Sequence, residues 1–142
     1  LGLSNIRTEL QDASVCREEW KDSADVVLCD VPCSGLGIIR KKPEIRFKNP
    51  DEIRTLPEIQ ARILANCAQY VKKGGTLVYS TCTILQRENE DVVRAFLTEN
   101  PEFEAVSWTH PVCGERADGM VTLLPPVHNT DGFFIAKMHR KV

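Results

Sequence analysis

The apolar residues of this chain fall into short runs and one long helical stripe. A continuous apolar run within residues 24–30 is typical of a strand buried on both faces. A similar run predicts a second buried strand over residues 76–81. Upstream, residues 5–9 favour one further short strand, which is followed by the carboxylate of Asp12. The first half of the pattern therefore predicts buried strands that end in polar residues.

Two helices are predicted from a spacing of three to four residues between apolar positions. A capping-box pattern from Thr55 to Glu58 marks the start of the first helix, with a proline in its first turn. Its apolar stripe continues to Val71, and residues 72–75 close it. The second helix carries the apolar positions of 92–97 and stops at residues 100–101, Asn-Pro.

The tail has a different pattern, because residues 120–124 and 133–138 are strand-like runs separated only by prolines and turn residues. This arrangement predicts a closing antiparallel pair. Together the elements describe an α/β domain whose mostly parallel sheet has an antiparallel edge. In such sheets ligands bind outside the carboxyl ends of the strands.

Composition narrows the class of protein. The 142 residues are 42% hydrophobic and 27% charged, which suits one domain with a real core and makes two domains unfavourable. A net charge of -2 excludes the strong positive field of a dedicated nucleic-acid binder. The segment Arg40–Lys48 is locally basic, with five basic residues against Glu44. It is either a solvated face or a local contact surface for phosphates.

The cysteines and the absence of apolar spans indicate the compartment. No run of eighteen apolar residues occurs, and the first ten residues lack the build of a secretory signal, so we expect a cytoplasmic protein without membrane partners. Six cysteines occur among apolar runs rather than in a short secreted chain, which favours free thiols. The spacing from Cys29 to Cys33 and the scattered histidines disfavour a metal site.

Three side chains that follow the predicted strands are candidates for chemistry. Cys82 comes directly after the second strand, where a thiol can be held rigidly and still reach a substrate. Asp30 ends the first strand, and Cys33 lies in the loop that follows. Each residue also has a structural explanation, because an isolated cysteine is often a small buried side chain and a strand-end aspartate often caps a turn. The placement of all three at one edge favours a site.

Two short motifs carry a family resemblance. Residues 30–35, Asp-Val-Pro-Cys-Ser-Gly, resemble the Asp-x-Pro-Cys-Ser-Gly motif of the RNA cytosine-C5 methyltransferases. About fifty residues later, residues 80–83, Ser-Thr-Cys-Thr, resemble the Thr-Cys motif of the same family. Further matches cover residues 37–45, 74–79, 88–90 and 131–137.

The resemblance implies a Rossmann-like, class I S-adenosylmethionine-dependent fold that methylates cytosine C5 in small-subunit (16S) ribosomal RNA. In this family the Thr-Cys thiolate, here Cys82, adds to cytosine C6, and the cysteine matched by Cys33 helps to release the product. The aspartate matched by Asp30 contacts the cytosine and lies near the cofactor, and Asp12 matches the carboxylate on the adenine side of the cofactor. The basic residues expected to bind the RNA are Arg40, Lys41, Lys42 and Arg46.

The chain departs from the family pattern by what it lacks. The glycine-rich cofactor loop, the acidic residue that binds the ribose and the amino-terminal RNA-binding region have no counterpart in it. We therefore expect residues 1–142 to form the carboxyl-terminal portion of a catalytic domain, an incomplete fold that binds the cofactor poorly and exposes a sheet edge. Two alternatives stay open at this point. The first is a transfer-RNA or 23S ribosomal RNA target, and the second is a non-catalytic RNA-binding remnant.

Overall fold

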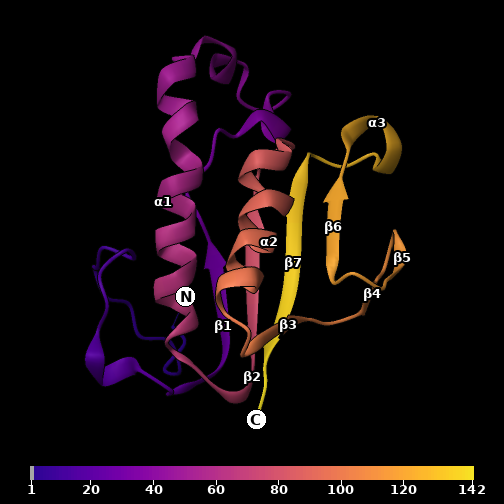
Figure 1. Cartoon of the computed structure of the whole chain (residues 1–142). Helices are drawn as coiled ribbons and strands as arrows, with labels where there is room; N and C mark the ends of the chain where they lie inside the picture. The colour runs from indigo at the N-terminus through magenta and orange to yellow at the C-terminus, as the bar shows by residue number, and fades with distance from the viewer. Residues whose placement is uncertain (1) are drawn as a thin grey trace.

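A mixed five-stranded sheet forms the centre of the computed structural model, which describes residues 2–142 (Figure 1). Its strands are β1 (Ala24–Asp30), β2 (Val71–Thr81), β7 (Phe133–Arg140), β3 (Phe103–Ala105) and β6 (Met120–Leu123). The order is β1-β2-β7-β3, and β6 pairs with the first half of β7. β1 and β2 are parallel, whereas β7 is antiparallel to β2, β3 and β6. Four strands thus share one direction, and the predicted parallel sheet with an antiparallel portion is confirmed.

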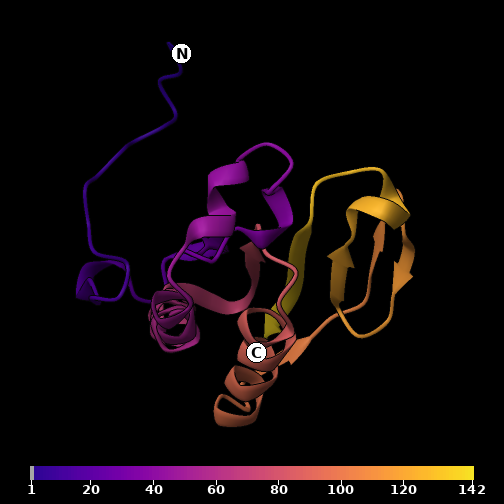
Figure 2. The same cartoon turned by 90° about the horizontal axis from the view of Figure 1, so that it is seen from above.

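Both long helices cover the same face of this sheet. Seen from above, α1 (Pro50–Ala68) and α2 (Glu90–Glu99) lie side by side below the strands (Figure 2). The alternation of β2 sends Leu77 and Tyr79 into this layer, where they are fully buried with Leu64, Phe134 and Met138. The predicted second helix is confirmed, and it ends at Asn100 as expected.

The first helix begins earlier than predicted. Its N-cap is Asn49, whose side chain accepts a hydrogen bond from the Asp51 amide at 3.0 Å, and Pro50 occupies the first helical position. The start expected at Thr55 was therefore wrong, and Pro57 lies inside the helix. The end was also wrong, because residues 71–75 belong to β2. There Gly74, with φ of 77°, lies in a bulge opposite β1 rather than after a helix.

Two strand predictions need correction. β1 is an edge strand, and Val26 and Leu28 on the face away from α1 are 64% and 68% exposed, so it is buried on one face only. Residues 5–9 form no strand, because they have no pairing partner among residues 2–142. Leu3, Ile6 and Leu10 are correspondingly exposed.

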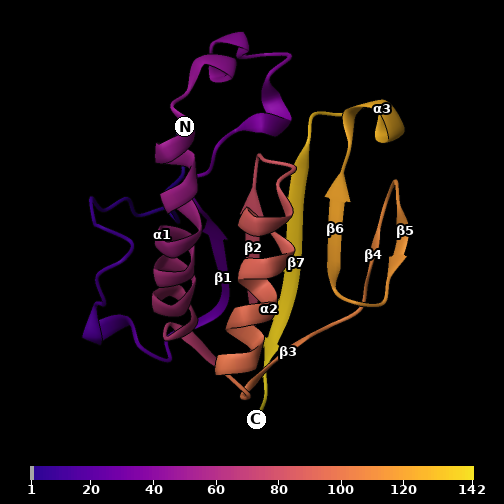
Figure 3. The ribbon, with the colours of Figure 1, turned by 45° about the horizontal axis from the view of Figure 1, so that its top comes forward.

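Smaller elements complete the chain. The hairpin of β4 (Trp108–His110) and β5 (Gly114–Arg116) lies beside β6, on the side away from α1 (Figure 3). The short helix α3 (Pro125–His128) connects β6 to β7. Single 3-10 turns occur at Glu18–Trp20, Leu36–Ile38, Pro43–Phe47 and Gln86–Glu88. Within residues 2–142, no helix has the length and apolar character needed to cross a membrane.

Candidate active site

The loops that follow β1 and β2 meet at the carboxyl ends of these parallel strands. The strand register pairs Asp30 with Ser80, so Cys33 and Cys82 lie in loops that leave the same edge of the sheet. Their Sγ atoms are 3.3 Å apart, and both side chains are half-buried. Two thiols from positions 49 residues apart in the sequence therefore share one site.

Close backbone packing fixes the Cys82 loop. The Gly37 amide donates to the Cys82 carbonyl at 3.0 Å, and the Gly132 amide donates to the Gly37 carbonyl at 2.8 Å. A Cβ atom on Gly37 would lie only 2.1 Å from the Gly132 carbonyl oxygen. Only glycine at position 37 allows these three segments to approach so closely.

A direct hydrogen bond joins the two cysteine loops beside the sulfurs. Ser34 Oγ and Thr83 Oγ1 lie 2.7 Å apart, and both residues are fully buried. Each hydroxyl belongs to the residue that follows a cysteine in the sequence. The two loops are therefore linked side by side, not merely adjacent.

Burial and, after it, the hydrogen bond with Cys82 raise the pKa of the Cys33 thiol to about 12. Cys33 therefore keeps its proton near neutral pH, and either sulfur can be the donor in the contact between Cys33 Sγ and Cys82 Sγ. The strand ends therefore hold a protonated thiol, Cys33, in contact with a second half-buried thiol, Cys82.

Asp30 lies at the mouth of this site with an exposed side chain. Ser80 Oγ donates to Asp30 Oδ1 at 2.8 Å, which orients the carboxylate at the end of the strand. A surface hollow of about 710 Å³ runs along β1 as far as Leu28, with Trp20 and Tyr70 also in its lining. The hollow thus leads along the exposed apolar face of β1 towards Asp30.

Asp12 is not brought to the cysteines. Its side chain is exposed and bonds within its own turn, to the amide and hydroxyl of Ser14 at 2.9 and 2.7 Å. These hydrogen bonds hold the pKa of Asp12 below its ordinary value. Asn66 of α1 anchors the segment by donating to the carbonyls of Ala13 and Val15.

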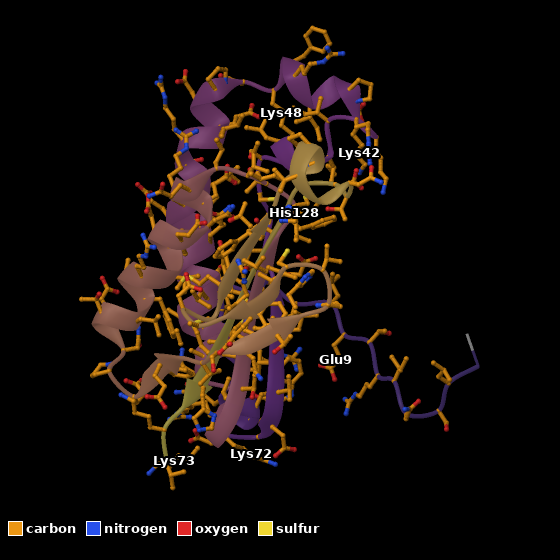
Figure 4. The ribbon with its side chains drawn as sticks, turned by 90° about the vertical axis from the view of Figure 1, so that its right-hand side faces the viewer. Glu9, Lys42, Lys48, Lys72, Lys73 and His128 are labelled. Carbon is orange, nitrogen blue, oxygen red and sulfur yellow. The ribbon has the colours of Figure 1, made fainter. Side chains whose placement is uncertain are left out.

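The basic segment lies at the same end of the molecule as the strand ends. Figure 4 shows Lys42 and Lys48 at this end and Lys72 and Lys73 at the other. Lys41 Nζ is 2.5 Å from Asp131 Oδ2, and an Arg40 nitrogen is 3.4 Å from Asp131 Oδ1. Lys41 and Arg40 hold the pKa of this buried carboxyl below its ordinary value. Two of the four predicted RNA-binding residues are therefore already paired.

Sequence reasoning missed several residues that shape this end. Lys48 Nζ donates to the Ser34 carbonyl at 2.8 Å and so ties the basic segment to the Cys33 loop. Ile45 is buried against Gly35, whereas the Phe47 side chain is 86% exposed. The only sequence signal for Phe47 was an aromatic residue between Arg46 and Lys48.

The sequence analysis assigned no role to the buried pair Glu88 and Asn89, which lie within the family match at residues 88–90. Both are fully buried at the start of α2, next to the cysteine loops. No group of three or more possible metal ligands occurs in the part of the chain that the structure describes.

Comparisons with known proteins converge on one family. A family model described as 16S rRNA methyltransferase RsmB/F matches residues 1–139. The probable ribosomal RNA small subunit methyltransferase B of Bacillus subtilis is 44% identical over 99% of this chain and 33% of its own length. The corresponding Thermus thermophilus protein is 40% identical over 84% of this chain and 30% of its own length. The chain thus spans about a third of the curated relatives it matches.

Solved structures share the fold. The crystal structure of PH0851 superposes with a TM-score of 0.90 at 35% identity, over 98% of this chain and 32% of that one. A methyltransferase homolog protein from Pyrococcus horikoshii gives a TM-score of 0.65 at 31% identity, over 82% of this chain and 39% of that one. NSun6 from Pyrococcus horikoshii, solved with SFG, gives 0.76 at 24% identity, over 98% and 35% of the two chains.

Proposed function

This chain belongs to the 16S rRNA methyltransferase RsmB/F family, and on that premise we propose that it carries the catalytic cysteines of a cytosine-C5 methyltransferase acting on 16S ribosomal RNA. The observation that carries the proposal is the 3.3 Å separation of Cys33 Sγ and Cys82 Sγ at the carboxyl ends of two parallel strands. The curated relatives are named as small-subunit ribosomal RNA methyltransferases, which favours this substrate over transfer RNA or 23S ribosomal RNA.

Cys82 is the nucleophile of the proposed reaction. Its thiolate forms a bond to cytosine C6, and the displaced electron pair makes C5 nucleophilic. After C5 has gained a methyl group, water takes up the C5 proton, and cleavage of the S–C6 bond restores the ring and returns the bonding electron pair to Cys82 as the thiolate. Cys33, in contact with Cys82 Sγ, assists this release. Asp30 holds the polar edge of the base, because its carboxylate is exposed and oriented by Ser80.

The residues present fit one side of the methyl donor. The hollow along β1 offers an apolar wall for a flat ring, and the exposed carboxylate of Asp30 follows it along the chain. Asp12 supplies a second exposed carboxylate on the preceding segment. When bound, S-adenosylmethionine would supply an electrophilic methyl group. Asp30 and Asp12 would hold its polar groups.

The RNA is proposed to lie over the basic segment. Lys42, Arg46 and the partly engaged Arg40 and Lys41 can neutralise phosphates next to the target base. The exposed ring of Phe47 offers a face on which an unpaired base can stack. Because Lys48 ties this segment to the Cys33 loop, RNA held there is close to the cysteines.

The whole reaction needs more than these residues. The chain spans about a third of its curated relatives, so we propose that it forms the carboxyl-terminal portion of a larger catalytic domain. Backbone donors for the cofactor and a further RNA-binding region would come from the remainder. We propose a cytoplasmic location for the protein, in keeping with a ribosomal RNA substrate.

A covalent trap tests the proposal. RNA containing 5-azacytidine can retain a thiol adduct at C6, so we expect the full-length protein to form a covalent complex that mass spectrometry maps to Cys82. Cys82→Ala should abolish the complex, and Cys113→Ser, a thiol on the β4–β5 turn, should not change it. An undiminished complex in Cys82→Ala would remove Cys82 from the mechanism.

A further inference from the structure

Two consecutive buried residues each hold one of the cysteine loops. The Ser34 amide donates to Glu88 Oε2 at 2.8 Å, which anchors the residue directly after Cys33. Gln60 Nε2 bridges the same carboxylate oxygen and the Pro32 carbonyl, both at 3.0 Å, and so anchors the residue directly before Cys33. Glu88 and its partner Gln60 therefore fix the backbone on both sides of this cysteine.

Asn89 does the same for Cys82. Thr81 Oγ1 donates to Asn89 Oδ1 at 2.6 Å, and Asn89 Nδ2 donates to the Thr83 carbonyl at 3.0 Å. The residues before and after Cys82 are thus both bonded to one amide side chain. Asn89 stands at the N-cap position of α2, but its side chain makes no capping hydrogen bond. Its amide is used for the cysteine loop and not for the helix.

The burial of Glu88 costs more free energy than a purely structural contact requires. Glu88 is fully buried, and its Oε1 and the Oε1 of Gln60 are buried without a hydrogen-bond partner in the part of the chain that the structure describes. Burying a carboxylate with an unpaired oxygen costs free energy, which the bonds from the Ser34 amide and Gln60 to the other oxygen have to offset. Stability alone is therefore a poor explanation for Glu88.

We propose that Glu88 and Asn89 are positioning residues that set the separation of Cys33 Sγ and Cys82 Sγ. Because the two residues are joined by one peptide bond, the two loops are held at a fixed spacing by the start of α2. Tyr79 OH donates to the Glu88 carbonyl at 2.6 Å and fixes that start to the buried face of β2. The catalytic meaning of this spacing rests on the proposed function, whereas the spacing itself does not.

A dithiol reagent measures the spacing directly. Phenylarsine oxide condenses with two neighbouring thiols to give a cyclic dithioarsenite and one water, so its affinity reports how well the pair is held. The affinity is measured on the full-length protein by competition with a small dithiol, and mass spectrometry confirms that Cys33 and Cys82 are bridged. We expect Glu88→Ala and Asn89→Ala each to weaken binding by about tenfold or more, because the pair loses its effective molarity.

Glu90→Ala is the matched control. Glu90 follows in the same turn and also receives a hydrogen bond, from Thr122 Oγ1 at 2.7 Å, but among residues 2–142 its side chain makes no hydrogen bond to either cysteine loop. This variant should bind the arsenical within about twofold of the parent, even where its loss of thermal stability equals that of the other two. Unchanged affinity in the folded Glu88 and Asn89 variants, or an equal loss in Glu90→Ala, would overturn the proposal.

Conservative variants keep the test valid if the alanine variants fail to fold. Glu88→Gln retains an acceptor for the Ser34 amide, and Asn89→Asp retains the acceptor for Thr81 but loses the donor to Thr83. Glu88→Gln should restore most of the arsenical affinity, and Asn89→Asp should restore less. In methyl transfer, both alanine variants should lower kcat by about a hundredfold with little change in KM. If the azacytidine trap fails but the alanine variants of Glu88 and Asn89 still bind the arsenical more weakly than Glu90→Ala, the proposed reaction is rejected. The positioning role is then retained.

Discussion

The cysteine pair and the basic segment lie at the same end of the molecule, but they are held in different ways. Cys33 and Cys82 are half-buried in loops fixed by buried hydrogen bonds and by glycine-glycine contact. Lys42, Arg46 and Phe47 are exposed at the start and the end of the 3-10 turn Pro43–Phe47, which is anchored mainly by Ile45 and Lys48. Groups that make and break bonds need a fixed geometry, whereas groups that bind a flexible polyanion need charge and long, mobile side chains.

The largest expected effect concerns Cys33. Cys33→Ser should lower multiple-turnover methylation by about a thousandfold, because removal of a proton-donating group beside the departing Cys82 sulfur costs on the order of 10² to 10⁴. The Cys82–RNA adduct should then persist on natural cytosine, where denaturing gel electrophoresis detects it. Product release at the parental rate would remove Cys33 from this step and weaken the claim that the pair acts together.

The glycine contact gives the next largest effect. Gly37→Ala should destabilise the protein by about 3 kcal/mol, because its Cβ would overlap the Gly132 carbonyl and force the backbone apart. Gly114→Ala is a matched control, since it has a positive φ but open space around it, and it should cost about 1 kcal/mol. Denaturant unfolding of both variants compares them. Equal losses would show that the site loops are less tightly packed than the structure has them.

The basic segment should respond to salt rather than to packing. Replacing Lys41, Lys42 and Arg46 together with alanine should weaken RNA binding about ten- to hundredfold at low salt. It should also reduce the slope of log K against log salt by about 2. Titrations at several salt concentrations measure both, and replacement of Lys72 and Lys73 at the opposite end is the control. An unchanged slope would place the RNA elsewhere.

Titration of Cys33 should make the stability of the protein depend on pH. The raised pKa means that the folded state favours the protonated thiol. The resulting stabilisation is present below the ordinary thiol value of 9.0 and is lost as the pH rises towards about 12. Unfolding between pH 8 and 11 should show this decline in the parent and a smaller one in Cys33→Ser. At pH 8, an alkylating reagent should label Cys33 more slowly than an ordinary free thiol, because only the thiolate reacts.

The smallest effect is expected at Asp131, whose carboxylate pairs with Arg40 and Lys41 of the basic segment. Asp131→Asn removes the partner of Lys41 and Arg40, and freeing these cations should raise RNA affinity by less than about threefold. The lowered pKa of Asp131 means that its native contribution is present above the ordinary value of 3.8 and is lost as the pH falls below it. The difference in melting temperature between parent and variant should therefore shrink as the pH falls below 3.8. A difference that grows with falling pH would argue against the ion pair as its cause.

The order of the main elements followed from local patterns. β1, β2, α2 and the final antiparallel pair were all predictable, since each carries its periodicity within a short window. The start of α1 was missed because the capping box at Thr55 competed with Asn49 and Pro50, and only the latter pair is used. The short strands β3, β4 and β5 were also missed, because three residues carry too little pattern.

Local features of the sequence were enough to identify the candidate catalytic residues. Two cysteines and an aspartate after apolar runs, in motifs that resemble one family, were enough to predict a shared edge and a class of reaction. Only the tertiary structure decided the contacts, namely the 3.3 Å sulfur pair and the hold of Glu88 and Asn89 on its two loops. These contacts could not be predicted because the periodicity of a sequence reports only the burial of single residues. The meeting of side chains from distant segments depends on strand register and loop packing, which no local pattern encodes.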